Sequence, residues 1–420
     1  MLRRALLLAT VGTALLAPTA GAADYVPDEV VVRYAPQPDP VTRVVKVARG
    51  STLGATIARL EQRPDVLSAT PNYIARASFV PDDPGRGLTP GGWQALQWNF
   101  AGPFSVNAPD AWDNLARAGH PGGSGVVVAV LDTGVAYSDR GRFARSPDLR
   151  GDRFARGYDF VGDDPYPHDL NGHGTHVAST IAESVDNGIG LTGLAFGAKI
   201  MPVRVLDRNG EGDSAAISRG IRFAARNRAD IINLSFEFSE TVRAREIPDI
   251  LDALRMARRK GVLVVGASGN ASAGSVAYPA RANHVLSVGA TTERGCLAEY
   301  SNQGPTLDLV APGGGPDAPL DGDPNCRPLD RSGRDIYQMT FTSTVRTFAL
   351  DHFQGTSMAA PHVSGAAALL IASGLLGERP APDAVEGRLK ATARDLGAPG
   401  PDDHYGAGLV DARAATTPPA

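Results

Sequence analysis

Residues Phe353–Leu370 (FQGTSMAAPHVSGAAALL) constrain the fold more than any other stretch of the chain. Small apolar residues follow Ser357 on every face of the expected helix, so this helix must lie inside a large core. Ser357 would then lie at the helix N-terminus, beside unpaired backbone N–H groups and the positive end of the helix dipole. A serine there is a candidate nucleophile next to oxyanion-binding groups, and it is equally a candidate N-cap.

The length and charge of the chain exclude few folds but several functions. With 420 residues the chain is long enough for more than one domain. Its 41 Lys and Arg residues and 45 Asp and Glu residues give a formal charge of −4, which indicates no nucleic-acid partner and no basic membrane-binding surface. We expect a monomer. Cys296 and Cys326 are compatible with one disulfide in an exported protein or with two separate thiols.

Residues 1–23 have the order of a secretory signal peptide. Arg3 and Arg4 precede an apolar run over residues 5–16, and small residues follow up to Ala23. The apolar run is short for an uncleaved membrane anchor, and no later segment is expected to span a membrane. The pattern predicts a secreted protein, extracellular or periplasmic, with no membrane association after signal cleavage. Two arginines alone do not decide the export route.

Residues 24–79 predict a small α+β domain. Strands are expected over residues 29–33 and 41–47, a helix over 53–61 capped by Ser51, and a strand, turn and strand over 66–73. Such a unit has little core of its own and needs a partner surface for stability. The Gly- and Pro-rich residues 80–96 are expected to form a linker, or the start of the mature chain.

Strands and helices alternate over residues 97–414. Expected strands cover residues 126–131, 200–206, 230–234, 262–266 and 284–289, and expected helices cover 173–183, 213–225 and 247–259. The first strand is a continuous apolar run, which is typical of a parallel strand buried on both faces. The alternation predicts an α/β domain with a doubly wound, mostly parallel sheet. Residues 312–348 are expected to be a surface insertion and residues 415–420 a disordered tail.

Candidate catalytic residues lie at the ends of these elements, where such sheets gather functional groups. Asp132 ends the first long strand, His173 begins the next helix between two glycines, and Asn270 follows a later strand as a candidate oxyanion donor. Simpler structural interpretations are an N-cap for Asp132 and a turn for Asn270. His173 and His176 have a spacing that can bind a metal, but no third ligand stands in a convincing position.

The order of Asp132, His173 and Ser357 along the chain is that of the subtilisin branch of serine hydrolases. Three motifs resemble the catalytic motifs of the subtilisin-like serine protease family: Val130–Gly134 (VLDTG), His173–Ala178 (HGTHVA) and Gly355–His362 (GTSMAAPH). The resemblance extends from residue 97 to the ending Gly406–Asp411 (GAGLVD). Residues 24–79 resemble the inhibitory propeptide that precedes such catalytic domains.

The resemblance implies a secreted serine endopeptidase that is made as a self-processed zymogen. Its substrates would be proteins or peptides, and its own propeptide would be an intramolecular inhibitor, cleaved between residue 75 and the region of Asp82. Ser357 is expected to attack the peptide carbonyl, His173 to transfer the proton and Asp132 to hold the imidazole. The Ser357 N–H and the Asn270 side chain would bind the oxyanion, and His176 would be structural.

The family binds substrates along two backbone edges, which here correspond to Gly210, Gly212, Ser235, Phe236 and Glu237. The second edge departs from the family pattern, because Phe236-Glu237-Phe238 stands where the family usually carries Leu-Gly-Gly. These larger side chains predict a first specificity pocket that is narrowed, or changed towards small or basic residues. The segment is also compatible with a bend that turns the side chains to solvent.

Calcium is the cofactor that the resemblance implies, and no organic cofactor is expected. The expected ligands are oxygens of Gln97, Asp148, Val185, Asn187, Ile189 and Leu191. Hard oxygen ligands of this kind suit Ca²⁺, although the loop is also compatible with a metal-free surface loop. A second acidic group, formed by Asp159, Asp163, Asp164 and Asp169, is compatible with another ion or with a solvated loop.

Two other functions are compatible with the sequence. A catalytically silent protein with the same fold would bind polypeptide without cleaving it, and Phe236-Glu237-Phe238 leaves room for that reading. A non-proteolytic hydrolase, such as an esterase, would more naturally carry its serine in a Gly-x-Ser-x-Gly motif, which Ser357 lacks.

Overall fold

The computed structural model describes residues 25–35, 41–73, 80–87, 91–341 and 343–419. The chain forms two compact units that divide after Ser78, and each is described by itself. The expected signal peptide over residues 1–23 and residues 75–79 of the expected cleavage region lie outside the described residues. Within the described part of the chain, no helix has both the length and the apolar character needed to cross a membrane.

The first unit is a three-stranded antiparallel sheet with one helix, which confirms the predicted small α+β domain. The strands β1 (Tyr25–Tyr34), β2 (Val41–Lys46) and β3 (Val66–Tyr73) lie in the order β2-β1-β3, and α1 spans Leu53–Glu61. The fully buried core is small and comprises Val30, Val32, Leu60 and Ala69.

Two details of the first unit differ from the expectation. β3 is a single strand without a turn, because it pairs along its length with the central strand β1. The cap of α1 is Thr52, whose hydroxyl accepts the Ala55 N–H at 3.2 Å. Ser51 instead bonds to the Thr56 hydroxyl at 3.2 Å.

The second unit contains a seven-stranded sheet in the order β10-β9-β8-β7-β4-β6-β5, with every neighbouring pair parallel. Its strands are β4 (Val127–Asp132), β5 (Tyr158–Asp159), β6 (Lys199–Arg204), β7 (Ile231–Leu234), β8 (Leu263–Ala267), β9 (Leu286–Thr291) and β10 (Leu309–Pro312). This confirms the predicted doubly wound sheet. After β4, the chain adds β5 and β6 on one side of β4 and then crosses to add β7 on its other side. β4 therefore marks the switch point of the sheet, where a site is expected.

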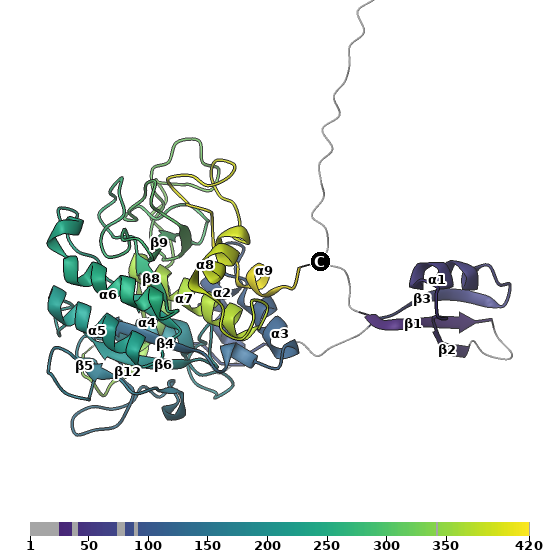
Figure 1. Ribbon diagram of the computed structural model, residues 1–420, viewed down its shortest axis with the longest axis horizontal. Coiled ribbons are helices and arrows are strands. Elements are labelled where there is room, and N and C mark those ends of the chain that lie inside the picture. Colours follow the sequence, from purple (N-terminus) through teal and green to yellow (C-terminus); the bar gives the residue numbers. More distant parts are fainter. Residues whose placement is uncertain (1–24, 36–40, 74–79, 88–90, 342, 420) are drawn as a thin grey trace, which may run out of the picture. The chain divides into compact units, whose positions relative to one another are not determined.

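Helices cover both faces of this sheet. On one face α5 (Ser214–Arg226) and α6 (Pro248–Arg259) lie side by side (Figure 1). On the other face lie α4 (His173–Ala182), α7 (Thr356–Ala372) and α3 (Ala108–Arg117). As expected from its composition, α7 is buried at every residue from Thr356 to Leu370.

The remaining elements are short. They are η1 (Gly92–Ala95), α2 (Trp98–Ala101), η2 (Pro121–Gly123), η3 (Gly151–Arg153), η4 (Ala244–Glu246), α8 (Pro382–Ala391), α9 (Ala412–Thr416) and the hairpin of β11 (Ile336–Phe341) and β12 (Phe348–Phe353). A disulfide joins Cys296 to Cys326.

Three segments expected at the surface contribute to the core. In the expected linker, Trp93 is fully buried and its indole N–H donates to the Pro81 carbonyl at 2.8 Å. In the expected insertion, Ile336 is fully buried and β11 packs against α4. In the expected tail, Ala415 is fully buried in α9. In each case apolar side chains within a polar or Gly- and Pro-rich stretch find a place in the core.

Candidate active site

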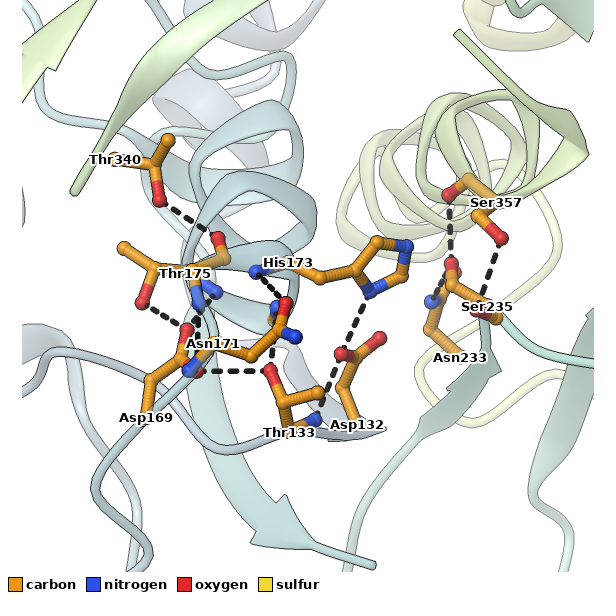
Figure 2. A network of polar contacts seen from close by, with 12 residues as sticks. Asp132, Thr133, Asp169, Asn171, His173, Thr175, Asn233, Ser235, Thr340 and Ser357 are labelled. Carbon is orange, nitrogen blue, oxygen red and sulfur yellow. Dashed lines mark hydrogen bonds and ion pairs between the residues drawn. The ribbon is translucent and has the colours of Figure 1, made fainter. Parts of the chain in front are cut away.

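Asp132 and His173 meet at the carboxyl end of β4. Asp132 is fully buried, and its Oδ1 lies 2.8 Å from His173 Nδ1 and accepts the Thr133 N–H at 2.7 Å. Asp132 Oδ2 has no hydrogen-bond partner among the described residues. The His173 ring, with 26 % of its side chain exposed, lies between Asp132 and Ser357, and its second nitrogen is on the side of Ser357 (Figure 2).

The charge of Asp132 favours the protonated form of His173. Burial lowers the pKa of His173, but the charge of Asp132 and its hydrogen bond outweigh burial and raise the pKa above its ordinary value. The more distant charges of Asp169 and Glu237 act in the same direction. The imidazole can therefore accept a proton readily at this position.

Asp169 holds the start of α4 against the end of β4 (Figure 2). Its carboxylate accepts five hydrogen bonds of 2.7–3.0 Å, from Thr133 Oγ1, Asn171 N, Gly172 N, Thr175 N and Thr175 Oγ1. Thr133 Oγ1 in turn accepts the Gly174 N–H at 3.0 Å. Asp169 is 2 % exposed, so these charge-assisted bonds are buried. They fix the backbone on both sides of His173.

Steric limits explain why glycine occupies the positions on either side of His173. Gly172 has a φ of 107°, and a Cβ there would lie 2.6 Å from the Phe341 carbonyl oxygen. A Cβ on Gly174 would lie 2.2 Å from the Gly134 carbonyl oxygen. Glycine at 172 lets the start of α4 lie against β11, and glycine at 174 lets it lie against the end of β4.

Ser357 is the second residue of α7, and its hydroxyl donates to the Ser235 carbonyl at 3.0 Å. Among the described residues it donates there rather than to His173, and catalytic hydrogen bonds often align only when substrate is bound. Pro361 has no N–H and so cannot bond to the Ser357 carbonyl four residues earlier. The Ser235 hydroxyl donates to that carbonyl at 2.8 Å, which ties the first turn of α7 to the end of β7 (Figure 2).

Asn233 and Ser364 extend this connection into the core. The Asn233 side chain donates to Ser235 Oγ at 2.8 Å and accepts from Ser364 Oγ at 2.8 Å. All of these side chains are buried. The position of Ser357 is therefore set by a fully bonded polar chain between β7 and α7.

Asn270 follows β8, and its amide is held in one orientation. Its Oδ1 accepts from the Thr356 N–H at 2.8 Å and from the Thr356 hydroxyl at 3.0 Å. Its NH₂ group therefore points away from α7, towards Glu237 Oε1 at 3.1 Å and Oε2 at 3.4 Å. The amide can donate to a negative oxygen, but a carboxylate occupies the donor.

His176 does not line the site. Its Nε2 lies 3.0 Å from the Ile336 carbonyl oxygen, and its ring stacks on Phe353 with centroids 4.7 Å apart. It is fully buried, and burial lowers its pKa to about 3. This neutral, packed ring fits the expected structural role.

A cavity of about 660 Å³ opens between His173, Asn270 and Ser357. Asp335 and His352 of the β11–β12 hairpin lie on its wall and pair with each other at 2.7 Å. The exposed loop with Gly210 and Gly212 lies nearby, because Asn171 of the same cavity donates to the Arg208 carbonyl at 3.0 Å. This arrangement could place an extended chain against Ser357.

The expected calcium loop surrounds buried carboxylates. Asp148 is fully buried, and it accepts from the Asn187 side chain at 2.7 Å and from the Leu191 N–H at 3.2 Å. Asp83 is also fully buried and accepts the N–H groups of Asp186 and Asn187 at 3.0 and 3.2 Å. Burial, reinforced by the charge of Asp83, raises the pKa of Asp148 to about 8.

Gln97, one of the expected ligands, bonds to Thr192 in this structure. Its side-chain oxygen already accepts from the Thr192 N–H and hydroxyl, both at 3.0 Å, and its NH₂ group donates to the Thr192 carbonyl at 2.7 Å. Asp83 supplies oxygens at the loop instead. In the described residues, no three His, Cys, Asp or Glu side chains form a cluster suited to a metal, so a site here would depend on carbonyl oxygens as well.

The carboxylates of the second acidic group bond to different partners. Asp159 pairs with Arg204 at 2.8 Å and accepts the N–H groups of Val161 and Gly162. Asp163 accepts from the Tyr158 hydroxyl at 3.0 Å, and Asp169 serves the start of α4. Each of these three carboxylates therefore has a hydrogen-bond partner within the protein.

The sequence interpretation missed the roles of Asp169, Asn233 and Asp83. Asp169 was grouped with its acidic neighbours, although its position four residues before His173 was a usable signal. Asn233 interrupts the otherwise apolar strand β7, which is a second usable signal. Asp83 lies in a stretch that reads as a linker, and nothing local distinguishes it from Asp82.

Comparison with known proteins finds relatives of this chain. Residues 123–408 match the family model described as the Subtilase family. The chain is 34 % identical over 346 residues to a thermophilic serine proteinase of Bacillus sp. (strain AK1), a match that covers 82 % of this chain and 73 % of that protein. It is 38 % identical over 325 residues to subtilisin Savinase of Lederbergia lenta, which covers 77 % of this chain and 99 % of that protein.

A solved structure has the same fold. A protein described among proteases from Pseudoalteromonas arctica PAMC 21717 superposes with a TM-score of 0.64 at 31 % sequence identity. The match covers 80 % of this chain and 99 % of the other.

Proposed function

This chain belongs to the subtilase family of serine endopeptidases, and on that premise we propose that it hydrolyses peptide bonds through an acyl-enzyme formed on Ser357. The observation that carries the proposal is the 2.8 Å contact of Asp132 with His173, in a cavity that Ser357 also lines. Buried Asp132 orients a ring whose second nitrogen faces the serine, which is the arrangement that nucleophilic catalysis by serine requires.

The residues divide the chemistry as follows. The Ser357 hydroxyl turns from the Ser235 carbonyl to His173, which takes its proton as Oγ attacks the peptide carbonyl carbon. Asp132 stabilises the imidazolium, and that ring then protonates the leaving amine. Water hydrolyses the ester by the same steps.

The oxyanion formed in each step requires donors. The Ser357 N–H, in the first turn of α7, and the Asn270 NH₂ group are the proposed donors. Loss of such an asparagine donor in subtilisin, itself a member of this family, lowers the rate about 10²–10³-fold.

We further propose that the protein is exported and processed. Residues 1–23 are removed as a signal peptide, and the separate unit that ends at Ser78 is an inhibitory propeptide that the enzyme cleaves from itself. The small core of that unit supports this role, because a domain with so few buried apolar residues gains stability from a partner.

A structural Ca²⁺ fits the loop at residues 185–191. Asp83, Asp148 and Asn187 would hold it with carbonyl oxygens of Val185, Ile189 and Leu191, and Asp83 replaces Gln97 in the set expected from sequence. Two buried carboxylates face one loop, and among the described residues no Lys or Arg side chain forms an ion pair with either. This supports the assignment, since buried charges require compensation. The ion supplies that compensation and would join the segment at residue 83 to the core.

The test is the intact mass and casein digestion of the secreted protein, for the wild type and Ser357→Ala. We expect a processed, active wild type and an uncleaved, inactive variant. A processed Ser357→Ala variant in a purified system would contradict self-cleavage. A mature wild type that neither digests casein nor reacts with a serine-directed phosphonate would instead be a silent polypeptide-binding protein.

A further inference from the structure

Glu237 is held beside the proposed oxyanion donor by its two neighbours. Phe236 is 8 % exposed and packs in the core under α5 and α6. Phe238 packs partly against the same core, and its N–H donates to the Tyr278 carbonyl at 2.7 Å. Between these two anchored phenylalanines, the Glu237 side chain is exposed and contacts Asn270. The segment does not bend away as a whole.

The carboxylate of Glu237 occupies the donor that a substrate needs. Both of its oxygens lie within 3.4 Å of Asn270 Nδ2. Asn270 cannot turn its NH₂ group elsewhere without losing the two bonds that Thr356 donates to its oxygen. An oxyanion formed from the substrate carbonyl must therefore share the Asn270 NH₂ group with Glu237 or displace Glu237 from it.

The charge of Glu237 matters even after this displacement. A carboxylate near the reacting carbonyl repels the oxyanion that forms there, and it raises the barrier for substrates that bring no compensating charge. A cation on the substrate removes both obstacles, because it withdraws the carboxylate from Asn270 and neutralises it.

The cation must come from one position of the substrate. The residue that carries the attacked carbonyl has its side chain on the adjacent carbon, so a long side chain at that residue reaches the surroundings of Asn270. Within the described residues, the carboxylate that lines the cavity itself is Asp335, which is already paired with His352. Glu237 reaches the cavity through its contact with Asn270; it is exposed, and among the described residues its hydrogen-bond partner is this neutral amide.

We propose that Glu237 is a specificity-determining residue that selects substrates with Lys or Arg immediately before the scissile bond. The inference rests on the proposed peptidase function and names its substrate class. Peptides with Asp or Glu at that residue are the poorest substrates, because two carboxylates then meet at the oxyanion site.

The test compares two peptides that differ only in charge, with arginine or its neutral isostere citrulline before the scissile bond. We expect kcat/KM of the wild type to favour arginine about tenfold, the size of a hydrogen bond to a charged group. Glu237→Gln keeps the shape and removes the charge, so its ratio should fall close to one, chiefly through faster cleavage of the citrulline peptide. Glu240→Gln, an equal change of charge at an exposed position of the same loop, is the matched control and should keep the wild-type ratio.

The outcomes separate this inference from the proposed function. Equal cleavage of both peptides by the wild type, or a preference that survives in Glu237→Gln, overturns the role of Glu237. A loss of preference in Glu240→Gln overturns it as well, because net charge would then explain the effect. Failure of the wild type to react with a serine-directed phosphonate and to cleave either peptide rejects the peptidase function itself.

Discussion

Substitution of Asp169 tests whether its hydrogen bonds stabilise the start of α4. The substitution Asp169→Asn keeps the volume of the side chain but replaces one carboxylate oxygen with an NH₂ group. Asp169 Oδ1 accepts three bonds and Oδ2 accepts the Thr175 N–H and hydroxyl. An asparagine can satisfy the first set through its oxygen, but its NH₂ group then faces the Thr175 N–H.

The magnitude follows from these contacts. Two hydrogen bonds to a charged acceptor are lost, at about 1.5–3 kcal/mol each, and one buried N–H is left without an acceptor. The Thr175 hydroxyl can rotate to accept from the new NH₂ group and recovers part of this. We therefore expect a decrease of about 3–5 kcal/mol in the free energy of unfolding, equivalent to roughly 4–7 °C in melting temperature for a unit of this size.

Calorimetry in a Ser357→Ala background avoids self-digestion during the measurement. Asp163→Asn is the matched control, because that carboxylate is exposed and accepts one bond, which asparagine can also accept. In the protein that retains Ser357, Asp169→Asn should also lower kcat, because residues 171 and 172, which directly precede His173, lose part of their support. A melting temperature within 2 °C of the control would refute the reasoning that the five bonds hold α4.

Two further predictions concern the charged groups. The pKa of His173 is raised because the charge and hydrogen bond of Asp132 outweigh burial, and the neutral ring is the active form, so kcat/KM should be lost as pH falls through a pKa above 6.5. Asp132→Asn should move this limb to lower pH and reduce kcat about 10⁴-fold; an unmoved limb in the pH–rate profile would contradict it. For calcium, EGTA should lower the melting temperature by about 4 °C, the effect of losing an ion present at roughly 100 times its Kd from a unit of this size. Asp83→Ala should show the lower temperature without chelator and Gln97→Ala should still respond to EGTA, whereas a wild type indifferent to EGTA would remove the site.

The sequence was sufficient for features that local residues determine. The alternating pattern predicted five of the seven parallel strands within one or two residues, because a strand buried on both faces tolerates few polar side chains. The short edge strands β5 and β10 were not predicted. The all-round apolar character of α7 predicted its buried position. Asp132, His173, Ser357 and Asn270 were identifiable because each lies at the end of a regular element, where parallel strands converge.

Features that depend on the tertiary path were not predictable in the same way. The contacts of Asp83 with the loop at 185–191 depend on the path of the chain around residue 83, and a Gly- and Pro-rich stretch carries no pattern that shows this path. The contact of Glu237 with Asn270 joins positions 33 residues apart and depends on where two phenylalanines pack. Thr52 replaced Ser51 as a cap because boundaries shift by a residue when either hydroxyl can serve.

The attachment of residues 80–87 and 91–93 to the catalytic unit affects how long the active enzyme survives. Backbone bonds such as Gly85 N–H to the Gly190 carbonyl, at 2.8 Å, and the burial of Trp93 hold this segment on the catalytic unit. A protease at high concentration is its own substrate, and it cuts segments that open locally into an extended form. When opening is fast relative to cutting, the rate of autolysis follows the free energy of releasing the weakest segment rather than that of global unfolding. The half-life of the active protein then depends on how stably this N-terminal segment is attached, rather than on the residues around Ser357.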